Sequence, residues 1–295
     1  MNIRQLEYFY EIVNSGSFSK AAEKLFVAQP AISMSIKQLE EEIGIQLINR
    51  LNKGISLTPE GGRIFYHAEK ILADMDSLQN EIDDLKGVKT GTIHIGIPEM
   101  LGNYYFSLIL AEFKQQYPAI KMVIESEPSN SIKAKIASGD IDLGIISTDN
   151  ISSEYDSHFL FNEEILIGLS IDNPLSKKQS LTLNDIQNED FLLFGKGNYH
   201  LRELLLNLME SSGIEPNIVF ESNLTETIKS LTANNIGISA FLKKVIENDK
   251  EIVSTKLEPR LFTSIGIAWK KGSYISKANK LFIEFLNKKM GQTKN

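Results

Sequence analysis

The sequence predicts an α/β protein in three consecutive parts: a winged helix-turn-helix over residues 1–60, a linker helix over 61–90 and a larger α/β region over 91–295. Three patterns support this prediction. Two short helical segments and a small hairpin come first, then apolar residues that repeat every 3.5 positions, then alternating strand and helix patterns. A length of 295 residues suits about two domains of roughly 150 residues each, and an apolar content of 42% can supply their cores.

The helix-turn-helix prediction rests on residues 17–57. A first helix from Phe18 to Leu25 carries two adjacent alanines, which are small enough for close helix packing. A second helix begins at Gln29, and its apolar side chains share one stripe at the helical period. They are Ile32, Ile36, Leu39 and Ile43. An ordinary pair of surface helices has the same periodicity, so that alternative stays open at this point.

The opposite face of the second helix carries mostly small, polar or basic residues, which suit the major groove of DNA. We expect Gln29 and Ser33 to read bases, whereas Lys37, Arg50 and Lys53 would position phosphates. The predicted DNA-binding residues are Gln29, Pro30, Ser33, Met34, Lys37, Arg50 and Lys53. Residues 1–65 hold seven basic and seven acidic side chains. Because these charges cancel, individual basic residues at the contact face, and not a net positive charge, must attract the DNA phosphates.

The segment after the hairpin predicts a long helix that begins at Thr58 and Pro59, as cap and first helical residue. Apolar residues follow at alternating spacings of four and three, which is the seam of a coiled coil. The predicted dimerisation residues are Ile64, Ala68, Ile71, Met75, Leu78, Ile82 and Leu85. The alternative is an amphipathic helix that lies on its own domain.

The order and spacing of residues 9–61 resemble the LysR-type transcriptional regulators. The resemblance is carried by Phe9, Ser15-Gly16-Ser17-Phe18, Ala21-Ala22, Leu25, Gln29-Pro30-Ala31, Ser33, Ile36, Leu39-Glu40, Gly44, Leu47, Arg50 and Leu57-Thr58-Pro59-Glu60-Gly61. Met34 departs from it, because the family commonly has a basic residue after the serine. Either one phosphate or base contact is then lost, or a thymine methyl is read by apolar contact instead.

The resemblance also implies how the remaining parts work. The linker helix would pair two subunits, and two dimers would join into a tetramer through the effector domains. Residues 91–295 would form two subdomains that exchange strands, as in periplasmic binding proteins, with ligand in the cleft between them. We place subdomain one at about 91–161 and 267–295, and subdomain two at about 162–266.

Strand patterns in the last part cover residues 92–97, 121–126, 143–147, 165–171, 191–194, 218–221, 236–240 and 262–269, with helical patterns between them. Such alternation predicts mainly parallel sheets, and ligands gather beyond the carboxyl ends of parallel strands. The predicted effector-binding residues are Pro98, Glu99, Met100, Ser129, Ser147, Thr148, Phe194 and Lys196. Ordinary loops without a ligand are the alternative. We expect a small organic acid, with Lys196 supplying charge and Glu99 favouring an effector that also carries a donor group.

Other classes of protein find little support. The chain has no cysteine and four scattered histidines, so we predict no metal site, no cofactor and no enzymatic activity. The N-terminus has charges where an export signal would be apolar, and no apolar run could span a membrane, so we expect a cytoplasmic protein. An extracytoplasmic solute-binding protein and a DNA-binding metabolic enzyme are therefore disfavoured alternatives. The expected partners are double-stranded DNA with dyad symmetry, a small-molecule effector and further copies of the chain as homodimer and homotetramer, with RNA polymerase as a further candidate.

Overall fold

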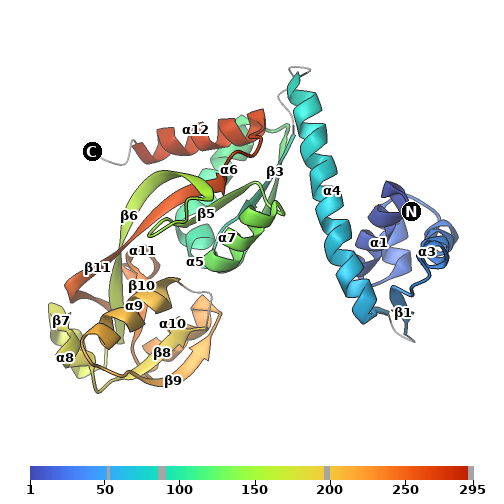
Figure 1. Ribbon diagram of the computed structural model, residues 1–295. Helices are drawn as coiled ribbons and strands as arrows, with labels where there is room; N and C mark the ends of the chain where they lie inside the picture. Colours follow the sequence, from blue (N-terminus) through green and yellow to red (C-terminus); the bar gives the residue numbers. More distant parts are fainter. Residues whose placement is uncertain (52–53, 86–90, 196–199, 292–295) are drawn as a thin grey trace. The chain divides into compact units, whose positions relative to one another are not determined.

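The computed structural model describes residues 1–51, 54–85, 91–195 and 200–291, without the side chains of 80, 83–85 and 291. The chain forms two compact units, Met1–Ile82 and Asp83–Asn295 (Figure 1). In the part described, no helix is long and apolar enough to cross a membrane.

The first unit contains the predicted helix-turn-helix, hairpin and linker helix. Its elements are α1 (Ile3–Ser15), α2 (Phe18–Lys24), α3 (Gln29–Ile43), β1 (Ile48–Arg50), β2 (Ile55–Leu57) and α4 (Pro59–Leu85). Asn2 and Gln5 form a capping box at the start of α1, which satisfies two N–H groups that a helix leaves unpaired. β1 and β2 pair antiparallel as the wing.

The core of the first unit is formed by the stripe of α3 that the sequence predicts. Ile32, Ile36 and Leu39 are at most 1% exposed, and Ile43 packs at the edge of this core. The start of α4 also belongs to it. The Phe65 ring stacks on Tyr10 at 5.6 Å and meets the edge of Phe9 at 5.9 Å.

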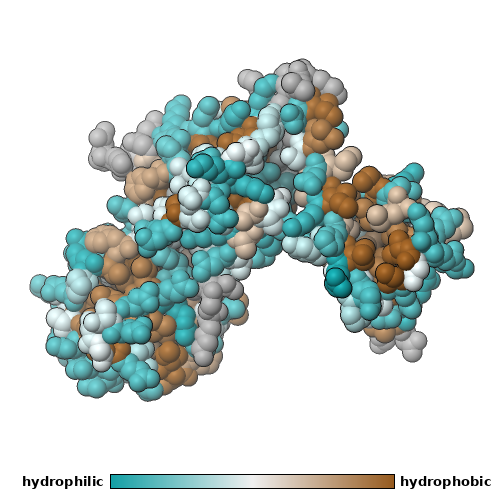
Figure 2. Space-filling view, in the orientation of Figure 1, coloured by the Kyte–Doolittle hydropathy of each residue, from teal (hydrophilic) through white to brown (hydrophobic). Residues whose placement is uncertain are grey.

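These contacts correct one part of the predicted dimerisation seam. Ala68 is 1% exposed because it packs against its own unit, so it has no surface left for a second chain. Ile64 is partly buried in the same core, as the alternative of a helix on its own domain expects. Farther along α4, Ile71, Met75 and Leu78 stay exposed. Figure 2 shows apolar surface at intervals along this helix.

The second unit is built around a seven-stranded sheet with the order β10-β6-β11-β5-β3-β4 and with β7 beside β11. Its strands are β3 (Gly91–Gly96), β4 (Ile120–Glu125), β5 (Leu143–Ser147), β6 (Tyr155–Ser170), β7 (Ser180–Thr182), β10 (Ser239–Leu242) and β11 (Ile252–Lys270). A small parallel sheet pairs β8 (Asp190–Phe194) with β9 (Asn217–Ser222).

Helices cover these sheets. They are α5 (Glu99–Leu101), η1 (Gly102–Phe106), α6 (Ser107–Gln116), α7 (Ser129–Ser138), η2 (Pro174–Lys177), α8 (Leu183–Ile186), α9 (His200–Ser211), α10 (Thr225–Ala233), α11 (Lys243–Ile246) and α12 (Lys277–Gly291). Phe113 of α6 packs its ring against Phe282 and Phe285 of α12, at 4.9 and 5.3 Å.

The expectation of mainly parallel sheets is wrong for the large sheet, which is mixed. β3 pairs parallel with β4 and β5, but β11 pairs antiparallel with both β5 and β6. β6 and β11 are also much longer than the strands that the sequence predicts at 165–171 and 262–269. The prediction was too short because the remaining part of each strand carries exposed polar residues and lacks a continuous apolar pattern. The strand predicted at 236–240 is shifted to Ser239–Leu242.

The two long strands connect the two halves of this unit. Figure 1 shows β6 and β11 running from the half with α6, α7 and α12 to the half with β8, β9, α9 and α10. The subdomain boundaries predicted near 161 and 266 both fall inside these strands.

Candidate DNA-contacting face and ligand pocket

The face of α3 opposite its buried stripe is open. Gln29, Pro30 and Lys37 are exposed, Met34 is 62% exposed, and Ser33 is partly exposed. Of the predicted DNA-binding residues, Lys53 lies outside the described residues. The others on α3 share one accessible face, as groove contact requires.

Arg50 of the wing strand β1 reaches back to this face. Its Nη2 atom donates to the Ser33 hydroxyl at 2.9 Å, and its guanidinium lies 4.7 Å from the centre of the Phe18 ring. The bond leaves the Ser33 hydroxyl hydrogen free to donate to a base. Lys37 Nζ lies 3.5 Å from Glu41 on the same exposed helix face, a pairing of small worth in water.

Glu40 has a role that sequence reasoning missed. Its Oε1 atom accepts from the backbone N–H groups of Leu47 and Ile48, at 2.7 and 3.1 Å. The carboxylate thus ties the end of the recognition helix to the first strand of the wing. On the far side of that strand, a side chain at Gly61 would approach the Leu47 carbonyl oxygen to 2.1 Å, so only glycine fits there.

Phe26 is a second residue that the sequence did not single out. It lies in the turn between α2 and α3, is 95% exposed and has a φ of 55°. Left-handed backbone is costly for a bulky residue, and an exposed ring gains little burial. No periodicity signals such a position.

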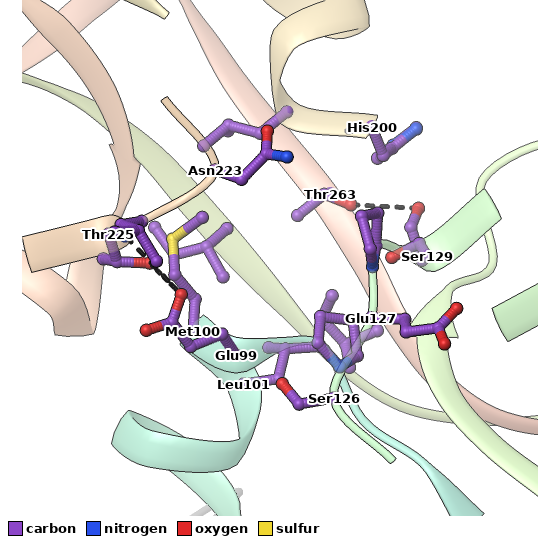
Figure 3. A pocket seen from close by; sticks show the side chains of 17 residues that line it. Glu99, Met100, Leu101, Ser126, Glu127, Ser129, His200, Asn223, Thr225 and Thr263 are labelled. Atoms are coloured by element: carbon purple, nitrogen blue, oxygen red, sulfur yellow. Dashed lines mark hydrogen bonds between the residues drawn. The ribbon is translucent and has the colours of Figure 1, made fainter. Parts of the chain in front are cut away.

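The second unit holds a pocket of about 410 Å³ among the loops after β3, β4 and β5 and the starts of α9 and α10 (Figure 3). It is lined by Pro98, Glu99, Met100, Leu101, Ser126, Glu127, Pro128, Ser129, Ser147, His200, Leu201, Asn223, Leu224, Thr225, Leu242, Thr263 and Ile265. Residues from both halves of the unit therefore face one cavity.

Five of the predicted effector-binding residues belong to this lining: Pro98, Glu99, Met100, Ser129 and Ser147. Thr148 does not, because its N–H and hydroxyl are engaged with the Ser264 carbonyl. Phe194 is 2% exposed and packs in the core. Lys196 lies outside the described residues.

The lining residues from the far half were missed. His200, Asn223 and Thr225 precede or begin α9 and α10, and Thr263 lies on β11. The sequence offers a usable signal for His200, Asn223 and Thr225, because they stand where a helix follows a strand. Thr263 and Ile265 carry no such signal, since they lie inside a strand and not beyond its carboxyl end.

Hydrogen bonds join the two sides of the pocket. Glu99 Oε2 accepts from the Thr225 hydroxyl at 3.1 Å, which joins the start of α5 to the start of α10 (Figure 3). Elsewhere, His200 Nε2 lies 3.0 Å from Asp149 Oδ2. Asn130 on α7 donates to Glu203 on α9 at 3.4 Å. These polar contacts connect the two halves beside the pocket, in addition to the apolar core that both halves share.

Asp149, the partner of His200, is held by several hydrogen bonds. It also accepts from the Thr263 hydroxyl at 2.8 Å and from the Ser264 N–H at 3.1 Å. Burial opposes ionisation of this carboxyl, but the hydrogen bonds from Ser264, Thr263 and His200 outweigh burial and hold its pKa below the ordinary value. Asp149 is therefore ionised at neutral pH.

Glu127 is the second carboxylate of the lining, and it forms a salt bridge with a lysine that it shares with Glu125. Lys135 Nζ lies 2.6 Å from Glu127 and 2.6 Å from Glu125. Burial opposes the charge of Lys135, but hydrogen bonds with these glutamates outweigh it and raise its pKa. Within the described ranges, no group of three histidine, aspartate or glutamate residues is placed to hold a metal ion.

Comparisons with known proteins agree with both units. Residues 3–62 match the family model for the bacterial regulatory helix-turn-helix protein, lysR family, and residues 86–291 match the LysR substrate binding domain. The chain is 30% identical over 287 residues to the uncharacterized HTH-type transcriptional regulator YybE of Bacillus subtilis, covering 97% of this chain and 98% of YybE. It is 28% identical over 290 residues to the transcriptional dual regulator GltC of the same organism, covering 97% and 96%.

Solved structures share the fold. HinK, a LysR family transcriptional regulator from Pseudomonas aeruginosa, matches with a TM-score of 0.62 at 27% identity over 99% of both chains. CbnR in complex with its target DNA matches with a TM-score of 0.73 at 19% identity, over 98% of this chain and 99% of CbnR. The two family models together span nearly the whole chain, and the geometry of both units agrees with them. The chain therefore belongs to the LysR-type family of DNA-binding transcriptional regulators.

Proposed function

We propose that this regulator binds a small-molecule effector in the pocket of its second unit and that binding changes how a pair of first units engages DNA. The observation that carries the proposal is the two-sided lining of the pocket, with Glu99 and Ser129 from one half and Asn223 and Thr225 from the other. A ligand that touches both halves binds some of their arrangements more tightly than others. It would therefore shift the population toward those arrangements.

The DNA-binding part of the proposal follows from the open face of α3. Gln29 and Ser33 would read base edges in the major groove, and Lys37, Arg50 and Lys53 would position phosphates. Met34 would contact a thymine methyl, because its exposed side chain is apolar where the family commonly has a basic residue. The hydrogen bond between Arg50 and Ser33 supports joint action of the wing and the helix.

The partner for the first unit would be a second copy. The exposed side chains of Ile71, Met75 and Leu78 lie on one seam of α4, where a symmetric partner helix can cover them. A symmetric pair of recognition helices fits an operator with dyad symmetry. We extend the proposal to a tetramer of two such dimers and to contact with RNA polymerase. Both extensions rest on the family and not on particular residues of this chain.

For the effector, we propose a small organic acid that also carries a hydrogen-bond donor. Ser129 and Ser147 offer hydroxyl groups, and Glu99 offers an acceptor to the donor group of the effector.

Selection of binding sites from random duplex DNA tests the regulatory function. Wild-type protein should enrich a sequence with dyad symmetry. Gln29→Ala should bind about 1–3 kcal/mol more weakly and lose its preference at one base pair in each half-site. Lys20→Ala is the control, because this exposed lysine lies on α2 and not on α3, so its loss should leave the base preference unchanged even where affinity falls. Unchanged preferences for Gln29→Ala would contradict the assignment of α3 as the reading helix.

A further inference from the structure

One carboxylate in the pocket stands apart from the other charged groups there. Figure 3 shows Glu99 beside Thr225, and Glu127 pointing away from it. Glu99 Oε2 accepts from the hydroxyl and, at 3.5 Å, from the backbone N–H of Thr225, and both donors are neutral. Among the residues that the structure describes, no lysine or arginine forms a salt bridge with Glu99.

The other acidic groups near the cavity are satisfied. Glu127 is paired with Lys135 at 2.6 Å, and Asp149 is held by His200, Thr263 and Ser264. In the described ranges the lining itself contains no lysine and no arginine. Among the described residues, Glu99 is therefore the carboxylate of the lining that has no cationic partner, and its charge favours a cation over an anion at this point of the cavity.

The rest of the lining is largely apolar. Its apolar members are Pro98, Met100, Leu101, Pro128, Leu201, Leu224, Leu242 and Ile265. They surround a volume of about 410 Å³, toward the lower end of the range of roughly 300–1,000 Å³ for small-molecule sites. An occupant with an apolar body and one charged end would match these walls.

We propose that the effector carries a cationic nitrogen that binds the Glu99 carboxylate, on a small apolar body that fills the rest of the pocket. This inference rests on the proposed function, because it takes the pocket as the effector site. An ammonium or amidinium group would give Glu99 a charge-assisted hydrogen bond while Thr225 keeps its own bond. An acid fits only if the same molecule carries that cation, because a simple dicarboxylate would meet Glu99 with like charge in a partly desolvated site.

Three probes with one carbon skeleton test the charge preference directly: hexylamine, hexanol and hexanoate. Thermal unfolding and calorimetric titration of the full chain should show that hexylamine binds at least about tenfold more tightly than hexanol. That ratio corresponds to about 1.4 kcal/mol, the low end for a hydrogen bond to a charged group. Hexanoate should bind more weakly than hexanol.

Glu99→Gln isolates the charge, because the amide oxygen of glutamine can still accept from Thr225. The advantage of hexylamine over hexanol should then disappear, while hexanol binding stays within about twofold. Glu154→Gln, which removes the same charge from an exposed position outside the pocket, should keep the full advantage. This control separates a local contact from a change in net charge.

Two results would overturn the inference. Equal response to the three probes, including no response to any, means that Glu99 does not select a cation. Preference for hexanoate that is lost in Lys196→Met would assign the site to an anion instead. Neither result touches the proposed regulatory function, since these assays contain no DNA. That function fails separately if Ser129→Trp, which fills the pocket, leaves the response of DNA binding to a cell metabolite extract unchanged.

Discussion

The glutamates of this chain show how the partner of a side chain decides its role. Glu40 accepts two backbone N–H groups and ties the wing to α3, Glu127 is paired with Lys135, and Glu99 meets the hydroxyl and N–H of Thr225. Sequence alone does not show these partners. Only the fold decides which donor each glutamate meets, because Ile48 lies on β1, Lys135 on α7 and Thr225 on α10.

Glu40→Ala should destabilise the first unit. The substitution leaves two partly buried N–H groups without their acceptor, which costs about 1–3 kcal/mol in free energy of unfolding. Chemical unfolding monitored by circular dichroism measures the change. Glu41→Ala, the exposed neighbour that pairs with Lys37, should change stability by less than about 0.5 kcal/mol. Equal effects of the two substitutions would show that the wing does not depend on Glu40.

Phe26→Asn should stabilise the first unit, whereas Glu40→Ala destabilises it. Asparagine tolerates the left-handed backbone that Phe26 adopts, and the 95% exposed ring contributes little burial to lose. The free energy of unfolding should rise by up to about 1 kcal/mol. Phe26→Leu serves as the control, because it keeps an apolar residue in the same strained backbone and should not stabilise. A fall in the melting temperature of Phe26→Asn would mean that the ring packs against something.

At the scale of elements, regular periodicity was predictable and long strands were not. Residues 29–43 and 143–147 agree with α3 and β5, because each presents one uninterrupted apolar pattern. β6 and β11 were predicted as shorter strands, because their outer halves are exposed and polar. That omission hid part of the antiparallel pairing of the two strands. The contribution of Thr263 and Ile265 to the pocket was missed for another reason, because both lie inside a strand and not beyond its carboxyl end.

The cluster around Asp149 joins three elements, the end of β5, the strand β11 and the start of α9. Because the pKa of Asp149 is below its ordinary value in the folded protein, ionised Asp149 stabilises the fold above about pH 3.9. This contribution is lost as pH falls through the lowered pKa. Asp149→Asn should therefore be less stable than wild type at pH 7, by about 1–3 kcal/mol.

The difference between wild type and Asp149→Asn should be present at about pH 4 and shrink as pH falls below it. Thermal unfolding across this range measures it. Asp172→Asn, an exposed position outside the cluster, should show little difference from wild type at any pH. If the stability difference between wild type and Asp149→Asn instead grew as pH fell below about 4, the pKa of Asp149 would not be lowered by folding.

At the scale of the whole molecule, charge and assembly are linked. The chain carries a net charge of −7, while residues 1–65 balance seven basic against seven acidic side chains. A neutral DNA-binding unit gains little from the phosphate attraction that supports non-specific binding. We therefore propose that specific binding draws on two recognition helices acting together and depends on the seam of α4.

Ile71→Asp combined with Leu78→Asp should break that seam. These side chains are 37% and 49% exposed in the single chain, so the fold tolerates the change, whereas a paired helix would bury the new charges. Each buried aspartate costs more than the roughly 1.4 kcal/mol that corresponds to a tenfold change, so the dimer should weaken by at least about a hundredfold. Sedimentation velocity should show the lighter species, and specific DNA binding should disappear with it. Ser77→Asp lies on α4 but off the seam, so it should leave both the sedimenting mass and DNA binding unchanged. If the doubly substituted chain still sedimented with wild-type mass, the pairing surface would lie elsewhere.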